Sequence, residues 1–248
     1  SVPLALVAMS YSVAAFPSLT AARVKQDWAS FRHEVWSAAQ QITLWSVPLL
    51  VLTIILSERL VRLLFGVGRF NEVDVKLTAT VLSVFSLSLL AQGLISLLVR
   101  AYYAAGHTRR PLVVNLFGAG LMVAVAAGAI YFFPAANWSL FILPGAFSLA
   151  MIINLIWLWR DFRHDLGGGG FNFIYFGKII LAAAAAAAIT ALLVHFWPVT
   201  PASTYSNLLA STAAAGLAGF GAYLLVIYLS SQSVLKLTHH DRSGNTQF

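Results

Sequence analysis

Three amide side chains interrupt the long apolar stretches of this sequence, at Gln92, Asn115 and Asn154. In such a stretch, a carboxamide can form hydrogen bonds with a neighbouring helix or contact the polar part of a ligand. The first role is the more common one between apolar helices. We therefore expect these residues to support packing or binding, and to face a polar cavity if they contact a substrate.

Three arginines border the apolar stretches, at Arg100, Arg109 and Arg110. The planar guanidinium group binds phosphate oxygens through two parallel hydrogen bonds, so these residues could contact a phosphate-bearing headgroup. Arginines beside an apolar span also fix which side of a membrane the adjoining loop occupies. Anchoring is the somewhat more common role, and both interpretations stay open at this point.

Groups that would carry catalysis or hold a metal are missing from the apolar stretches. No Asp or Glu lies near the middle of one, so the sequence offers no intramembrane proton relay, carboxylate pair or ion cage. The chain has no cysteine, and its adjacent His239 and His240 lie in a polar tail. The glycines at 167–170 lack the Lys-Ser/Thr pair of a phosphate-binding loop. We therefore expect no enzymatic activity, no cofactor and no metal.

The composition explains why these polar residues stand out. Of the 248 residues, 60% are hydrophobic and 9% are charged, and the mean hydropathy is +0.83. An ordinary soluble domain has about 25% charged residues. Helices of about 20 apolar residues span a bilayer, and the chain is long enough for about seven. The expected fold class is therefore an all-α integral membrane protein, a polytopic bundle of about seven transmembrane helices.

The apolar runs divide the chain into four parts. Residues 1–16 are too few to span a bilayer, so we expect a truncated transmembrane helix and a chain that is a fragment of a longer protein. Residues 17–41 combine charges with an apolar stripe, which indicates an amphipathic linker in the membrane interface; a solvated linker is the alternative. Residues 42–230 contain six spans, and residues 231–248 form a cytoplasmic tail. The six spans are expected at Ile42–Leu56, Leu77–Val99, Leu112–Phe133, Trp138–Trp159, Lys178–Trp197 and Asn207–Leu229.

The basic residues are distributed unevenly along this arrangement. The chain has 15 Lys and Arg against 8 Asp and Glu. If the chain crosses the membrane at each span, only Arg59, Arg62, Arg69 and Lys76 lie on one side, and the other eleven lie on the side of the tail. The positive-inside rule then puts the C-terminus in the cytoplasm. Because topology explains the net charge of +7, we expect no nucleic-acid partner.

Small residues gather in the last two spans. The alanine run at 182–188 includes Ala185, and the last span contains Gly216 and Gly219. Small residues let helices approach closely, so packing is the simpler interpretation. The functional alternative is a shallow groove that receives a lipid chain.

Three ordered motifs resemble those of one family, the MurJ (MviN) lipid II flippases of the multidrug/oligosaccharidyl-lipid/polysaccharide exporter superfamily. Residues 14–19, Ala-Ala-Phe-Pro-Ser-Leu, are similar to the end of an apolar helix in that family. Residues 63–70 followed by Asp74 resemble its Leu-Phe-x-x-Gly-x-Phe-x-x-x-Asp loop. Most specific is the stretch from Arg100 to Pro111, which is similar to the family's Phe-Tyr-Ala-x-x-Asp-Thr-Lys-Thr-Pro turn. The resemblance covers about residues 1–235 and corresponds to the second half of a family member.

The resemblance implies a protein of the bacterial inner membrane that moves an undecaprenyl-pyrophosphate-linked peptidoglycan precursor by alternating access between two helical lobes. Its partners would be that precursor, membrane lipids and a missing N-terminal lobe, which supplies most cavity cations in the family. The family's last two helices carry a groove for the lipid tail, which would fall on residues 178–197 and 207–229. The chain alone would then be inactive.

The sequence also departs from the family. The helix that would hold a carboxylate ligand for sodium has Asn115 near its start and no acid, so a sodium site is not supported. His107 stands where the family often has another polar residue. Two other functions stay open, a flippase for a different polyprenyl-linked glycan and a membrane scaffold that does not transport.

Overall fold

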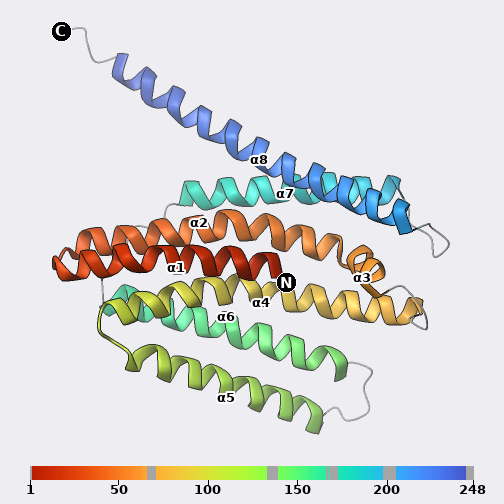
Figure 1. The fold of residues 1–248 in the computed structure, drawn as a ribbon, viewed down its shortest axis with the longest axis horizontal. Helices are drawn as coiled ribbons and strands as arrows, with labels where there is room; N and C mark the ends of the chain where they lie inside the picture. The colour runs from red at the N-terminus through yellow and green to blue at the C-terminus, as the bar shows by residue number, and fades with distance from the viewer. Residues whose placement is uncertain are drawn as a thin grey trace. The chain divides into compact units, whose positions relative to one another are not determined.

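The computed structural model describes residues 2–65, 71–132, 139–165, 167, 173–197 and 205–243. Every regular element in these ranges is an α-helix (Figure 1), which confirms the expected all-α class. Among the described helices, six (α2 and α4 to α8) are long and apolar enough to span a membrane. The helices are α1 (Val2–Val24), α2 (Trp28–Ile55), α3 (Ser57–Phe65), α4 (Glu72–Ala104), α5 (Arg109–Phe132), α6 (Ser139–Asp165), α7 (Phe173–Phe196) and α8 (Tyr205–Ser243).

The helices form two compact units, residues 1–170 and residues 171–248. In the first unit, α4 packs against α1, α2, α3 and α6, and α5 packs mainly against α6. Figure 1 shows α5 at the edge of this unit, with α6 between it and α4. The second unit is the pair α7 and α8, which pack against each other.

The core of the first unit lies where α1, α2 and α4 meet. Leu19, Phe31 and Leu97 come from these three helices, and none of them has exposed surface. Leu158 of α6 belongs to the same buried cluster. Because lipid offers no hydrophobic driving force between helices, this close packing is what holds the helices together. It fixes α4 and α6, which carry several of the polar residues considered below.

Both ends of α4 are set by local hydrogen bonds. At its start, the side chain of Asn71 accepts a bond from the backbone of Asp74, and the Asp74 carboxylate accepts one from the Asn71 backbone. This reciprocal pair is a capping box. At its end, Gly106 adopts a φ of +85°, and the backbone of His107 donates to the carbonyl of Tyr102 at 2.9 Å. Glycine suits this left-handed cap because it has no Cβ, and α5 starts three residues later.

An ion-pair cluster joins α3 to α4 at the opposite end of α4. The Arg62 guanidinium donates to both Glu72 and Glu58, at 2.8 Å for its Nη2 to Glu72 Oε2. Hydrogen bonding to Glu72 raises the pKa of Arg62. Burial lowers the pKa of the neighbouring Arg59. These contacts hold the short α3 beside the start of α4.

The first helix extends beyond the end expected from the sequence. We expected the apolar run to stop at residue 16 because a proline follows, but α1 continues through Pro17 to Val24. Ala15, Leu19 and Ala22 form one buried face along α1, which packs against α2 and α4. This burial on both sides of Pro17 stabilises a continuous helix across it, and neighbouring helices commonly compensate for prolines in membranes.

The expected boundary at residue 41 also differs from the structure. After a turn in which Gln26 has a φ of 55°, α2 starts at Trp28 and continues without interruption to Ile55. The apolar stripe that suggested a separate interfacial helix, including Phe31 and Val35, is buried in the core. The linker at 17–41 is therefore divided between α1 and α2. At the other end of the chain, α8 continues through Ser243, past the expected start of the tail at residue 231.

Candidate functional site

Two of the predicted polar residues meet across the α5–α6 contact. The Nδ2 of Asn154 donates to the Oδ1 of Asn115 at 2.9 Å, and Asn154 is only 3% exposed. The Oδ1 of Asn154 is buried and has no hydrogen-bond partner among the described residues. Gly118 makes the approach possible, since a Cβ there would lie 3.0 Å from the Asn154 Nδ2. The pair is an interhelical hydrogen bond of the kind expected between apolar helices.

The third amide, Gln92, does not join this pair in the described structure. Its Nε2 donates to the Ser88 Oγ of the same helix at 3.0 Å, and the side chain is half-buried. A different hydroxyl provides the polar link between α4 and α6, where Ser148 Oγ donates to the Val84 carbonyl at 2.8 Å. Sequence analysis missed Ser148 because a serine in an apolar helix usually bonds to its own preceding turn.

The three predicted arginines have different surroundings. The Arg110 Nη1 lies 3.4 Å from the Asp161 carboxylate, and its Nε lies 3.8 Å from that of Asp165. Arg109 is exposed, and Arg100 is half-buried in the last turn of α4. The two aspartates stand four residues apart on α6 and so share a face. That spacing was the signal in the sequence that could have identified the partners of Arg110.

An open groove lies between α5 and α6, beside these arginines. We call it the α5–α6 groove, and we include in it a smaller hollow that shares Trp157 but is lined by α6 residues alone. The larger has a volume of about 550 Å³ and the smaller about 350 Å³. The larger is lined by Gly106, His107, Thr108, Arg109, Arg110, Val113, Val114, Trp157 and Asp161, and the smaller by Ile153, Ile156, Trp157 and Arg160.

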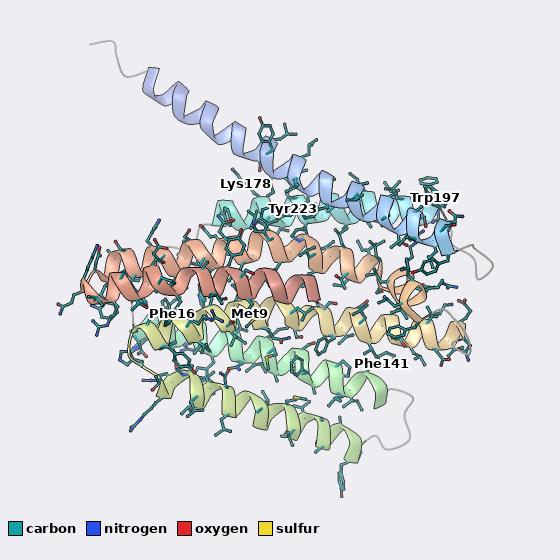
Figure 2. All side chains as sticks on the ribbon, viewed as in Figure 1. Met9, Phe16, Phe141, Lys178, Trp197 and Tyr223 are labelled. Atoms are coloured by element: carbon teal, nitrogen blue, oxygen red, sulfur yellow. The ribbon has the colours of Figure 1, made fainter. Side chains whose placement is uncertain are left out.

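The small residues of the second unit lie mainly along its helix contact. The buried residues of α7 and of α8 recur at helical spacing along one face of each helix, and those of α8 end at Gly219 and the fully buried Tyr223. Ala185 and Gly216 are half-buried. The Nζ of Lys178 donates to the Ser230 carbonyl at 2.7 Å and so links α7 to α8; Figure 2 labels Lys178 and Tyr223 on this pair. The buried α7 residues are Ile179, Ala182, Ala183, Ala186 and Thr190, and the buried α8 residues are Leu208, Ser211, Thr212, Ala215, Gly219 and Tyr223.

Among the described residues, no group of three or more His, Asp or Glu side chains is arranged to hold a metal ion. The polar arrangement of the first unit therefore consists of hydrogen bonds, ion pairs and a groove with cations at its edge.

The Asn115–Asn154 bond gives a first testable prediction. In a double-mutant cycle with Asn115→Ala and Asn154→Ala, we expect a coupling free energy of about 0.6 kcal/mol, the average for such bonds between membrane helices. Reversible unfolding in mixed detergent micelles would measure it. The matched control combines Gln92→Ala with Asn154→Ala and should be additive, because these two side chains share no hydrogen bond in the described structure. Additivity of the asparagine pair would contradict the assigned bond.

A family model described as "Lipid II flippase MurJ" matches residues 1–210. Among curated relatives, the "probable lipid II flippase MurJ" of Rickettsia prowazekii is 25% identical over 97% of this chain and 46% of its own length. The protein of the same description from Treponema pallidum is 25% identical over 65% of this chain and 30% of its own length.

A solved structure has the same fold. It is described as "Lipid II flippase MurJ, inward closed conformation" and aligns with a TM-score of 0.71 at 20% sequence identity. The alignment covers 94% of this chain and 45% of the solved chain. The chain thus spans about half the length, or less, of the relatives that it matches.

Proposed function

The chain belongs to the lipid II flippase MurJ family, and from this premise we propose that it forms one lobe of a two-lobe flippase for a polyprenyl-pyrophosphate-linked peptidoglycan precursor. The observation that carries the proposal is the family match over residues 1–210, combined with a fold match that covers 45% of a solved MurJ chain. Transport by alternating access requires two bundles that move about a central site. One bundle of that kind corresponds to about half of the relatives' length.

The distribution of charge in this chain supports a mechanism in which another lobe supplies the cations that contact the pyrophosphate. The 15 Lys and Arg lie at or near the ends of the apolar spans, and no acidic residue lies near the middle of one. A single charged side chain at the centre of a spanning helix costs about 2.5 to 3.5 kcal/mol on insertion scales. A pyrophosphate carries more charge, so it needs cations along its path. We assign those cations to the other lobe.

Fewer residues of this chain are proposed to contact the precursor than were selected from the sequence. Asn154 and Asn115 bond to each other, and Arg110 is paired with two aspartates, so we assign these three to helix packing and anchoring. Gln92 and Arg100 on α4 are half-buried, and they keep surface that a polar headgroup can reach. We retain Gln92 and Arg100 as proposed contacts of the precursor headgroup.

A rescue experiment in cells tests the proposed function. The second half of the Rickettsia prowazekii relative would be replaced by residues 1–248, since that relative aligns with 97% of the chain. We expect this chimera to restore growth to cells depleted of their own lipid II flippase, while residues 1–248 alone do not. Growth supported by the chain alone would contradict the two-lobe proposal. Failure of a chimera that inserts in the membrane at normal levels would contradict the flippase proposal itself.

The second unit is proposed to hold the prenyl tail of the precursor. The helices α7 and α8 carry small residues, and large apolar side chains such as Leu181 and Leu217 remain exposed on them. Small residues at a helix contact leave a shallow surface, which a chain of methyl-branched units can follow. Packing alone remains the competing explanation, because Gly219 is buried in the structure.

A pair of glycines separates the two explanations. Gly219 is buried, whereas Gly221 is exposed and a Cβ there would meet nothing within 4 Å. In the chimera, we expect Gly219→Leu to weaken binding of a polyprenyl phosphate about tenfold, the equivalent of about 1.4 kcal/mol. The control Gly221→Leu should leave binding unchanged. If Gly219→Leu lowers the melting temperature but not the lipid affinity, the small residues serve packing alone.

A further inference from the structure

We propose that the α5–α6 groove binds an anionic phospholipid of the surrounding bilayer, with its phosphate held by Arg109 and Arg160 and an acyl chain along the apolar wall below them. The proposal concerns a resident lipid and does not depend on precursor transport. It is carried by the shape of the groove, by its cations and by the exposed apolar surface that continues from it.

The groove has the dimensions and lining of a lipid site. Its two hollows, of about 550 and 350 Å³, both have Trp157 in their lining. The ring of Phe117 contacts Trp157 edge to face, with 4.9 Å between the ring centroids. Trp157 is 36% exposed. A tryptophan held in this way offers an apolar surface to a lipid chain and an N–H donor near the headgroup.

The charges at the edge of the groove favour an anion. Arg110 is neutralised by Asp161 and Asp165, which are the acidic groups near the groove in the described structure. Arg109 borders the larger hollow and Arg160 the smaller one, and both are exposed. Neither forms an ion pair with any described residue. Two cations therefore remain available to a phosphate, and the ion pairs of Arg110 hold α5 and α6 at the spacing that presents them.

The surface that continues from the groove suits an acyl chain. Val113 and Ile156 line the hollows and are 57% and 61% exposed, and Leu112 and Leu116 of α5 are 65% and 72% exposed. Cations at one end and apolar side chains along the helices match the order of headgroup and tail in a lipid.

Fluorescence quenching tests the proposal on the full chain. Because the chain has no cysteine, Tyr103→Cys gives a single attachment point for an environment-insensitive fluorophore, at an exposed position near the end of α4 that lines neither hollow. The labelled chain is placed in phosphatidylcholine nanodiscs that contain a small fraction of spin-labelled phosphatidylglycerol or spin-labelled phosphatidylcholine. We expect stronger quenching by phosphatidylglycerol. A basic side chain near an anionic lipid contributes about 1 kcal/mol, so each arginine should account for about a fivefold preference.

Variants of the arginines test whether the preference for phosphatidylglycerol depends on the cations of the groove. The double variant Arg109→Gln with Arg160→Gln should lose the preference for phosphatidylglycerol. The control Arg163→Gln should keep it, because Arg163 is exposed at the end of α6 and lines neither hollow. Equal quenching by the two lipids would overturn the proposal, as would an equal loss in the control.

Two competition arms distinguish the source of the phosphate. Inorganic phosphate and undecaprenyl pyrophosphate are each added to the labelled nanodiscs, and neither should restore the fluorescence at equimolar amounts. Recovery with inorganic phosphate would mean that the groove binds a soluble anion rather than a lipid. Recovery with undecaprenyl pyrophosphate would place the groove on the path of the precursor. Either recovery would overturn the assignment to a resident phospholipid, and neither would affect the proposed function.

Discussion

A cysteine that replaces Val73 is expected to react with a membrane-impermeant maleimide added to intact cells, and a cysteine that replaces Thr108 is expected to remain unlabelled until the cells are permeabilised. Val73 is 63% exposed in the first turn of α4, and Thr108 is exposed just after its end. At 1.5 Å per residue, the 33 residues of α4 extend about 50 Å, which exceeds the hydrocarbon core of a bilayer. The two positions should therefore lie on opposite sides of the membrane.

The expected direction follows from the basic residues. The end of α4 at Thr108 adjoins Arg100, Arg109 and Arg110, and the positive-inside rule puts such a cluster in the cytoplasm. The chain has no native cysteine, so each variant reports on one site. Labelling of both positions in permeabilised cells is the control for reactivity. Rapid labelling of Thr108→Cys in intact cells would reverse the proposed orientation of the C-terminus.

The spans could be predicted from the sequence because one physical requirement dominates them. A backbone that crosses lipid must satisfy its own hydrogen bonds, so long apolar runs become helices. The expected runs at 77–99 and 112–133 correspond to α4 and α5, with ends that differ by a few residues. The turn between these helices was predicted from its motif, and Gly106 provides its left-handed φ of +85°.

The ends of the first two helices could not be predicted in the same way. Local rules favour a stop at Pro17, since proline removes a backbone donor. The burial of Leu19 and Phe31 against α4 outweighs that local preference. Such packing depends on contacts between segments far apart in the chain, and hydropathy along one segment does not reveal them.

In the candidate site too, the polar residues could be predicted from the sequence, but their partners could not. The residue types at Asn115, Asn154 and Arg110 identified them as the polar features of the apolar helices. Their partners depend on the register between α5 and α6, which places residues 39 and 51 positions apart side by side. The larger hollow beside them, which residues of both helices line, results from that register and had no signal in the sequence.

If this chain is one lobe of a precursor flippase, flipping by purified protein in vesicles should require the other lobe, and this measurement tests the proposal most directly. Fluorescent lipid II is incorporated in both leaflets, and a membrane-impermeant reductant bleaches the outer leaflet. Vesicles that contain the chimera with the first half of the Rickettsia prowazekii relative should expose the inner-leaflet lipid during the assay. Vesicles that contain residues 1–248 alone should bleach only as far as protein-free vesicles. Flipping by the chain alone, or no flipping by a folded chimera, would contradict the account.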